Sequence, residues 1–182
     1  MNIVRSSALT LGFFAGWAVA LTVSCEFASG QTLSEINKRN EAVLEAWKET
    51  PFLVRNACFV AEAPECFGVY TPRSPAPFKS GEPMIVYAEP VAYGWKSVES
   101  DQYEFGFTID LIVKTAAGKK ILEKDKFGNM MFKSRAQNRE LFLKLTVDLT
   151  GADPGDYLLD FQVHDSETAN KTATIELPFT ME

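Results

Sequence analysis

The sequence is poor in the residues that most metal sites and nucleophilic enzymes require. Its 182 residues include one histidine and three cysteines. So few donors do not supply the ligands of a typical zinc site, and we expect neither a metal nor a cofactor. A nucleophile activated by imidazole would depend on His164 alone, and the sequence has no G-x-S-x-G motif. We therefore predict a protein that is not an enzyme.

Positive charge is also scarce, and it is not grouped. The chain has 18 Lys and Arg against 24 Asp and Glu, which gives a formal net charge of −6. Proteins that follow the phosphates of nucleic acids or lie on anionic membranes carry basic patches. We therefore expect no nucleic-acid partner.

Carboxylate chemistry is the enzymatic alternative that composition leaves open, because a glycosidase needs only two acids placed close together. Alternating strands put such side chains on solvent-facing surfaces, which favours the non-enzymatic interpretation. The candidate acids are Glu62, Glu65, Glu89, Asp101, Glu104 and Asp110.

Among the features that are present, the first is an export signal. Residues 1–30 combine a short start containing Arg5, an apolar run over residues 8–23, and small residues at the end. This three-part layout is typical of a secretory signal peptide. We expect cleavage between Gly30 and Gln31, and a periplasmic or secreted protein.

Two alternatives attach the protein to a membrane. The signal could remain uncleaved as an anchor, although a run of 16 residues is shorter than the roughly 20 that span a bilayer. Residues 21–25, Leu-Thr-Val-Ser-Cys, also loosely resemble a bacterial lipobox, in which Cys25 is lipidated. The protein would then be a membrane-tethered lipoprotein.

Cys58 and Cys66 remain after the signal is removed. A pair of cysteines in an exported chain favours a structural disulfide. A redox role has less support, because a catalytic dithiol is usually a C-x-x-C pair and this spacing is wider.

Residues 31–50 are predicted to form a short amphipathic α-helix. Thr32 to Glu35 has the form of a capping box, and Pro51 ends the helix. We expect the apolar stripe to pack against the protein's own sheet, with docking of a partner or a coiled coil as the alternative. Its members recur at helical spacing: Leu33, Ile36, Val43, Leu44 and Trp47.

From Pro51 onward the apolar residues follow the two-residue period of β-strands. Residues 71–83 contain four prolines and predict an extended connection or a sheet edge. Strands with one apolar face need a second sheet to cover it, so residues 51–182 are predicted to form an antiparallel β-sandwich of about seven to eight strands. An eight-stranded barrel is the alternative. The expected strands cover residues 52–60, 66–70, 84–91, 103–113, 119–127, 141–149, 157–163 and 173–179.

The C-terminal end has a recognisable pattern. Residues 149–159 read L-T-G-A-D-P-G-D-Y-L-L, followed by Val-His-Asp at 163–165, Lys-Thr-Ala at 171–173 and Leu-Pro-Phe at 177–179. This stretch of about 30 residues resembles the last hairpins of bacterial exported Ig-like domains. The resemblance implies an Ig-like sandwich in which the Tyr157 hydroxyl bonds back to the upstream chain. It implies a fold and leaves the function open.

The candidate binding residues are Tyr87, Glu89, Tyr93 and Trp95. Aromatic rings near a glycine and a proline at the end of a strand can form a platform on which a sugar or a peptide stacks. The alternative is that some of these rings belong to the core or an edge.

These features predict an exported, non-enzymatic binding module of the bacterial envelope. Its expected partner is an envelope protein, which would contact the helix stripe or a strand edge, or an extracellular carbohydrate or peptide. A carbohydrate-binding or carbohydrate-cleaving sandwich, with Glu89 or Glu104 beside the platform, is the alternative.

Overall fold

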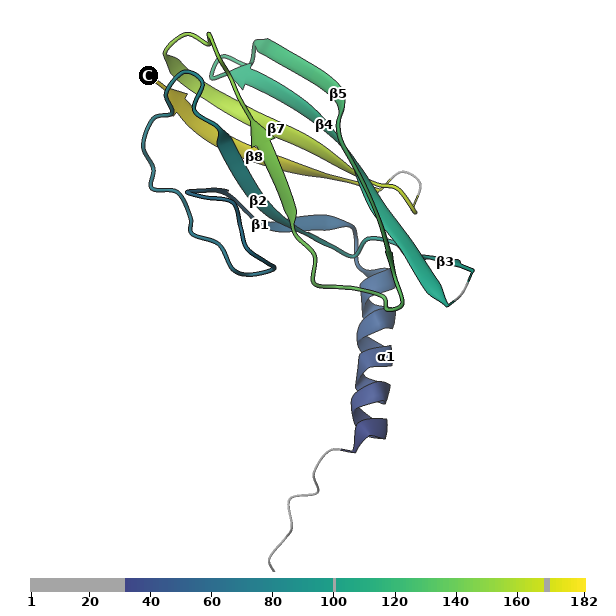
Figure 1. Cartoon of the computed structure of the whole chain (residues 1–182). Helices are drawn as coiled ribbons and strands as arrows, with labels where there is room; N and C mark the ends of the chain where they lie inside the picture. The colour runs from purple at the N-terminus through teal and green to yellow at the C-terminus, as the bar shows by residue number, and fades with distance from the viewer. Residues whose placement is uncertain (1–31, 100, 169–170) are drawn as a thin grey trace, which may run out of the picture.

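The computed structural model describes residues 32–99, 101–168 and 171–182, so the predicted signal peptide and Cys25 lie outside the described residues. One helix precedes eight strands in the described part of the chain (Figure 1). The elements are α1 (Leu33–Glu49), β1 (Leu53–Val60), β2 (Met84–Val91), β3 (Lys96–Val98), β4 (Gln102–Thr115), β5 (Lys120–Ser134), β6 (Leu143–Val147), β7 (Gly155–Asp165) and β8 (Thr172–Met181).

The strands form two antiparallel sheets. The smaller sheet has the order β1-β2-β6, and the larger one has the order β3-β4-β7-β8 with β5 paired to β4. Figure 1 shows the two sheets layered against each other, with α1 projecting from one end. The predicted all-β sandwich with a short helix before its strands is confirmed.

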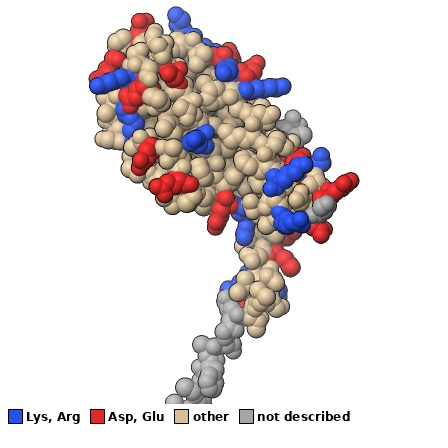
Figure 2. Space-filling model, viewed as in Figure 1, with Lys and Arg blue, Asp and Glu red and all other residues tan. Residues whose placement is uncertain are grey.

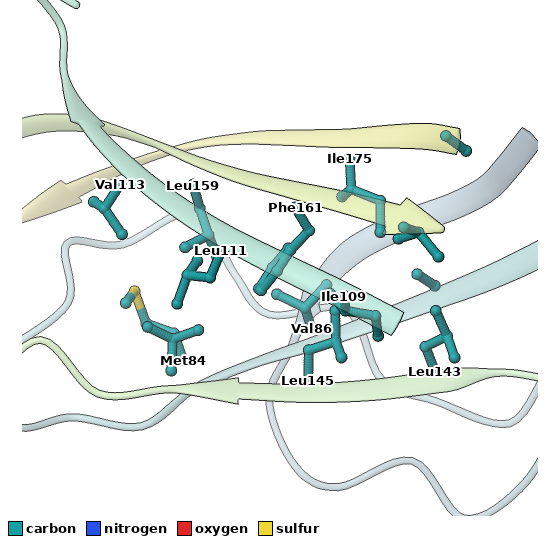
Figure 3. Close-up of a cluster of buried hydrophobic side chains, with 14 of the residues drawn as sticks. Met84, Val86, Ile109, Leu111, Val113, Leu143, Leu145, Leu159, Phe161 and Ile175 are labelled. Atoms are coloured by element: carbon teal, nitrogen blue, oxygen red, sulfur yellow. The ribbon is translucent and has the colours of Figure 1, made fainter. Parts of the chain in front are cut away.

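The core fills the space between the sheets because alternate residues of each strand face inward. β6 shows the alternation clearly, since Leu143, Leu145 and Val147 are buried while the two residues between them are exposed. Each such side chain contributes roughly 1.5–3 kcal/mol by leaving water. Figure 3 shows this cluster, which includes Met84, Val86, Ile109, Leu111, Val113, Leu143, Leu145, Leu159, Phe161 and Ile175.

The hydroxyl half of the capping box and the tyrosine turn form as expected, whereas the Glu35 carboxylate accepts a hydrogen bond from Arg39. The Thr32 hydroxyl accepts a 3.3 Å hydrogen bond from the backbone N–H of Glu35 at the start of α1. The Tyr157 hydroxyl donates a 2.6 Å hydrogen bond to the carbonyl oxygen of Asp153, four residues upstream. Residues 71–83 form a connection outside the named strands, touching neighbouring strands through bridges at Pro72 and Phe78.

Three strand predictions need correction. Residues 66–70 form a turn closed by a bridge between Cys66 and Val69 instead of a strand. β5 runs to Ser134, well past the expected end at Phe127. The prediction ended too early because the side chains of β5 are mostly exposed and show little apolar alternation. The short strand β3 was not predicted at all, since three residues are too few to establish a period.

The expected disulfide between Cys58 and Cys66 is not found in the structure, where both are free cysteines. Cys58 lies in β1 opposite Tyr87 and is half-buried. Cys66 is exposed in the tight turn that bridges to Val69. Burial raises the pKa of the Cys58 thiol above its ordinary value.

Candidate functional site

Two of the predicted binding residues, Tyr87 and Glu89, lie on β2, the central strand of the smaller sheet. Both are buried, with 0% and 3% of their surface exposed. The Tyr87 hydroxyl donates a 2.7 Å hydrogen bond to Glu89 Oε1 and accepts one of 2.8 Å from the backbone N–H of Gly68. The Tyr70 ring stacks on the Tyr87 ring at 4.0 Å. The segment that contains Gly68 and Tyr70 therefore covers this face of β2.

The Glu89 carboxylate has partners at both oxygens. Its Oε2 accepts hydrogen bonds from Arg55 Nε at 2.7 Å and from Asn56 Nδ2 at 3.1 Å. Burial, together with the neighbouring carboxylate of Glu89, raises the pKa of Tyr87 to about 12. Burying a carboxylate without such partners costs free energy. We therefore interpret this network as structural: it holds the covering segment on the sheet.

Tyr93 and Trp95 lie in the segment that leaves β2, near β3. Tyr93 is 1% exposed, and its ring packs against Phe105 and Phe107 of β4. Burial raises the pKa of Tyr93 far above its ordinary value. The Tyr93 hydroxyl and the Trp95 indole both donate hydrogen bonds to the carbonyl oxygen of Asn138, at 2.7 and 3.2 Å.

The exposed aromatic platform that the sequence led us to expect is therefore not formed by these residues. Tyr87, Glu89 and Tyr93 are buried, and Trp95 is half-buried. The alternation within β2 does not reveal this, because β2 is buried on both faces. The face that carries Tyr87 is covered by the segment with Gly68 and Tyr70, which is distant in sequence. The two-residue period of a strand does not predict such a cover.

The residue that sequence reasoning missed at this place is Trp47, in the last turns of α1. Its indole N–H donates a 2.9 Å hydrogen bond to the carbonyl oxygen of Tyr93. Its ring stacks on Trp95, with ring centroids 5.3 Å apart and an interplanar angle of 24°. The available signal was its position at the end of the apolar stripe, immediately before Thr50 and Pro51.

Most of the α1 stripe is uncovered, although Leu44 is half-buried, and this corrects the expectation that the stripe packs on the protein's own sheet. No residue of α1 is buried. Leu33, Ile36 and Val43 are 73%, 44% and 46% exposed. Of the stripe, Trp47 packs against the core, because the helix projects away from the sandwich and meets it at its C-terminal end (Figure 1). Figure 2 shows α1 as a narrow projection below the body of the protein.

An open groove of about 510 Å³ lies where α1 joins the sandwich. Val43 and Trp47 form part of its wall, so the groove continues the apolar stripe of the helix. Its lining also contains two arginines: Arg55 is paired with Glu89, whereas Arg139 has no ion pair with another described residue. The lining residues are Val43, Trp47, Arg55, Phe67, Gln137, Asn138, Arg139 and Glu140.

A second groove, of about 400 Å³, lies between β1, β8 and the proline-rich connection. The Arg73 guanidinium lies 3.8 Å from the centre of the Phe78 ring and is paired with Glu82 at 2.9 Å. The backbone of Phe78 also pairs with the end of β8. Pro178 lies within β8, and a proline on an edge strand discourages the addition of another strand.

His164 on β7 joins three strands of the larger sheet. Its ring nitrogens lie 2.9 Å from Asp110 Oδ2 on β4 and 2.9 Å from the Thr172 hydroxyl on β8. The backbone N–H of Lys126, and secondarily His164, hold the pKa of Asp110 below its ordinary value. None of these three side chains lines the grooves described above. We therefore interpret the contacts of His164 with Asp110 and Thr172 as a link between neighbouring strands.

No known family model and no curated protein matches this chain. Within the described ranges, no helix is long and apolar enough to cross a membrane. In the same residues, no group of three or more potential metal ligands comes together.

Proposed function

We propose that this chain is an exported, non-enzymatic binding module of the bacterial envelope, and that it docks a protein partner on α1. The docking face consists of Leu33, Ile36, Val43 and the groove at the base of the helix. The observation that carries the proposal is the exposure of this stripe on a helix that stands clear of the sandwich.

The anchoring of α1 supports this function. Trp47 fixes the C-terminal end of the helix through its hydrogen bond to Tyr93 and its stacking on Trp95. Most helical stability in proteins comes from tertiary packing of the apolar face rather than from intrinsic helix propensity. A 17-residue helix that is packed at one end only gains stability when a partner covers the rest of its stripe.

The carbohydrate alternative has less support. The rings of Tyr87 and Tyr93 are buried, so they are not accessible for stacking on a sugar. The buried acids also have partners: Glu89 is bonded to Arg55, and Asp160 to Lys114. A strand edge is likewise a weaker docking site, because Pro178 and the bridge at Phe78 protect the end of β8.

Affinity capture from envelope extract tests the proposal with two matched variants. Ile36→Glu places a charge on the apolar face, and Ala42→Glu adds the same charge on the opposite face of α1. We expect Ile36→Glu to lose a specific protein that wild type and Ala42→Glu both retain, identified by its mass. Equal recovery of every protein by all three chains would contradict the proposal. The terminal mass of the exported chain separates a free Gln31 from a lipidated Cys25.

A further inference from the structure

We infer that the partner on α1 is the α1 helix of a second copy of this chain, paired antiparallel in a two-fold symmetric dimer. This inference rests on the proposed docking function and specifies its occupant. The observations that carry it are the order of charges along the helix, the residue at the middle of the stripe, and the groove at its base.

Charge changes sign along α1. The N-terminal half carries Lys38 and Arg39 against Glu35, a net charge of +1. The C-terminal half has the opposite sign, a net charge of −2, from Glu41, Glu45 and Glu49 against Lys48. Arg39, Glu41 and Lys48 lie beside the stripe and Lys38, Glu45 and Glu49 lie behind it, so these charges act between two helices at longer range. An antiparallel pair places halves of opposite net charge alongside each other, whereas a parallel pair places like charges together. The helix dipoles also oppose each other in the antiparallel arrangement.

The stripe is nearly symmetric about Asn40. Leu33 lies seven residues before Asn40 and Trp47 seven residues after it, so all three share one face of the helix. In an antiparallel pair centred on Asn40, the two Asn40 side chains meet at the two-fold axis. An amide has both donors and an acceptor, so two of them can hydrogen-bond to each other. A polar residue at such a position fixes the register of paired helices.

The same register places the free end of each helix at the base of the other. Leu33 of the second copy then lies beside Trp47, at the groove of about 510 Å³. Val43 and Phe67 supply apolar contacts there, and Arg139 lies in the lining without an ion pair to another described residue. Because the contact is the same in both directions, it closes as a dimer.

Light scattering across a dilution series of the exported full-length chain tests this inference. We expect the mass of two copies at micromolar concentration. Ile36→Glu with Val43→Glu should weaken the dissociation constant by at least about 100-fold, because central apolar contacts dominate such interfaces. Ala42→Glu, on the outer face, should change it by less than about threefold.

A charge exchange tests the antiparallel orientation. Lys38→Glu with Arg39→Glu makes both halves of α1 negative and should weaken the dimer by about 10-fold. Adding Glu41→Lys and Glu45→Lys makes the C-terminal half positive and should restore it. Failure of this restoration would overturn the orientation.

A wild-type chain that remains monomeric up to about 100 µM would overturn the dimer. If that monomer still captures a different protein through Ile36, the docking function stands, and only the proposal that the partner is a second copy is wrong. If the monomer captures nothing that depends on Ile36, both proposals fail.

Discussion

The indole of Trp47 donates its hydrogen bond to the backbone carbonyl of Tyr93, across 46 residues of sequence. One side chain thus joins the base of α1 to the turn after β2, and Trp95 completes the contact by stacking on the same indole. The direction in which α1 leaves the sandwich is set by this cluster.

The first prediction concerns this joint. Trp47→Phe keeps an aromatic ring and loses the hydrogen bond to Tyr93, which should cost about 1 kcal/mol. Trp47→Ala also removes the stacking and should cost about 2 kcal/mol, since the side chain is half-buried. In both variants amide exchange over α1 should accelerate. Glu45→Ala on the outer face is the control, and exchange that speeds up equally in this variant would contradict the account.

The second prediction concerns the buried hydroxyl of Tyr87. Tyr87→Phe leaves the Gly68 N–H and one oxygen of Glu89 without a partner, so the free energy of unfolding should fall by about 1–3 kcal/mol. Tyr70→Phe is the matched control, because the two rings stack on each other and the Tyr70 hydroxyl has no hydrogen bond within the described residues. It should change stability by less than about 0.5 kcal/mol in urea denaturation. Equal costs for the two variants would refute the role of the hydroxyl.

The third prediction is a loss of stability in alkaline solution. Burial raises the pKa of Tyr87 from its ordinary 10.0 to about 12, so the folded protein retains the phenolic proton longer than the unfolded chain. The stabilisation is therefore complete below pH 10 and is lost as the pH rises towards 12. Burial also raises the pKa of Tyr93, so its ionisation destabilises the fold in alkaline solution as well. Between pH 10 and about 12, the slope of the free energy of unfolding against pH should be smaller in Tyr87→Phe by up to about 1.4 kcal/mol per pH unit. Denaturation at a series of pH values in this range measures that slope. An unchanged slope would show that Tyr87 does not titrate with folding.

Much of this fold was predictable because it depends on local patterns. The alternation in residues 103–113 and 141–149 identifies β4 and β6, and the capping pattern at Thr32 gives the start of α1. The binding residues were harder to place. Tyr87 and Glu89 look exposed in the sequence, yet a segment some 20 residues away in sequence covers them.

The opposite error occurred at the helix. The apolar stripe that contains Ile36 has the spacing of a buried face, but periodicity does not say whether the covering surface belongs to the same chain. That information comes from tertiary structure, where Trp47 alone among the stripe residues packs against the core.

The fourth prediction concerns the two cysteines. As free thiols they should differ in reactivity, because Cys66 is exposed whereas Cys58 is half-buried and its pKa is raised. Iodoacetamide should therefore modify Cys66 first in the native protein, and Cys66→Ser should remove this fast phase. If mass spectrometry of the exported protein finds both thiols oxidised to one disulfide, the free-thiol state described here is wrong for that compartment.

The central claim is that the apolar face of α1 is covered by another protein chain, and site-specific photo-crosslinking in exporting cells tests it most directly. The crosslinking amino acid is placed at position 36 on the apolar face and, as the matched control, at position 38 on the opposite face. The account predicts a protein adduct from position 36 and little from position 38, with a mass that corresponds to two copies of this chain. An adduct from neither position, or equal adducts from both, would contradict the claim.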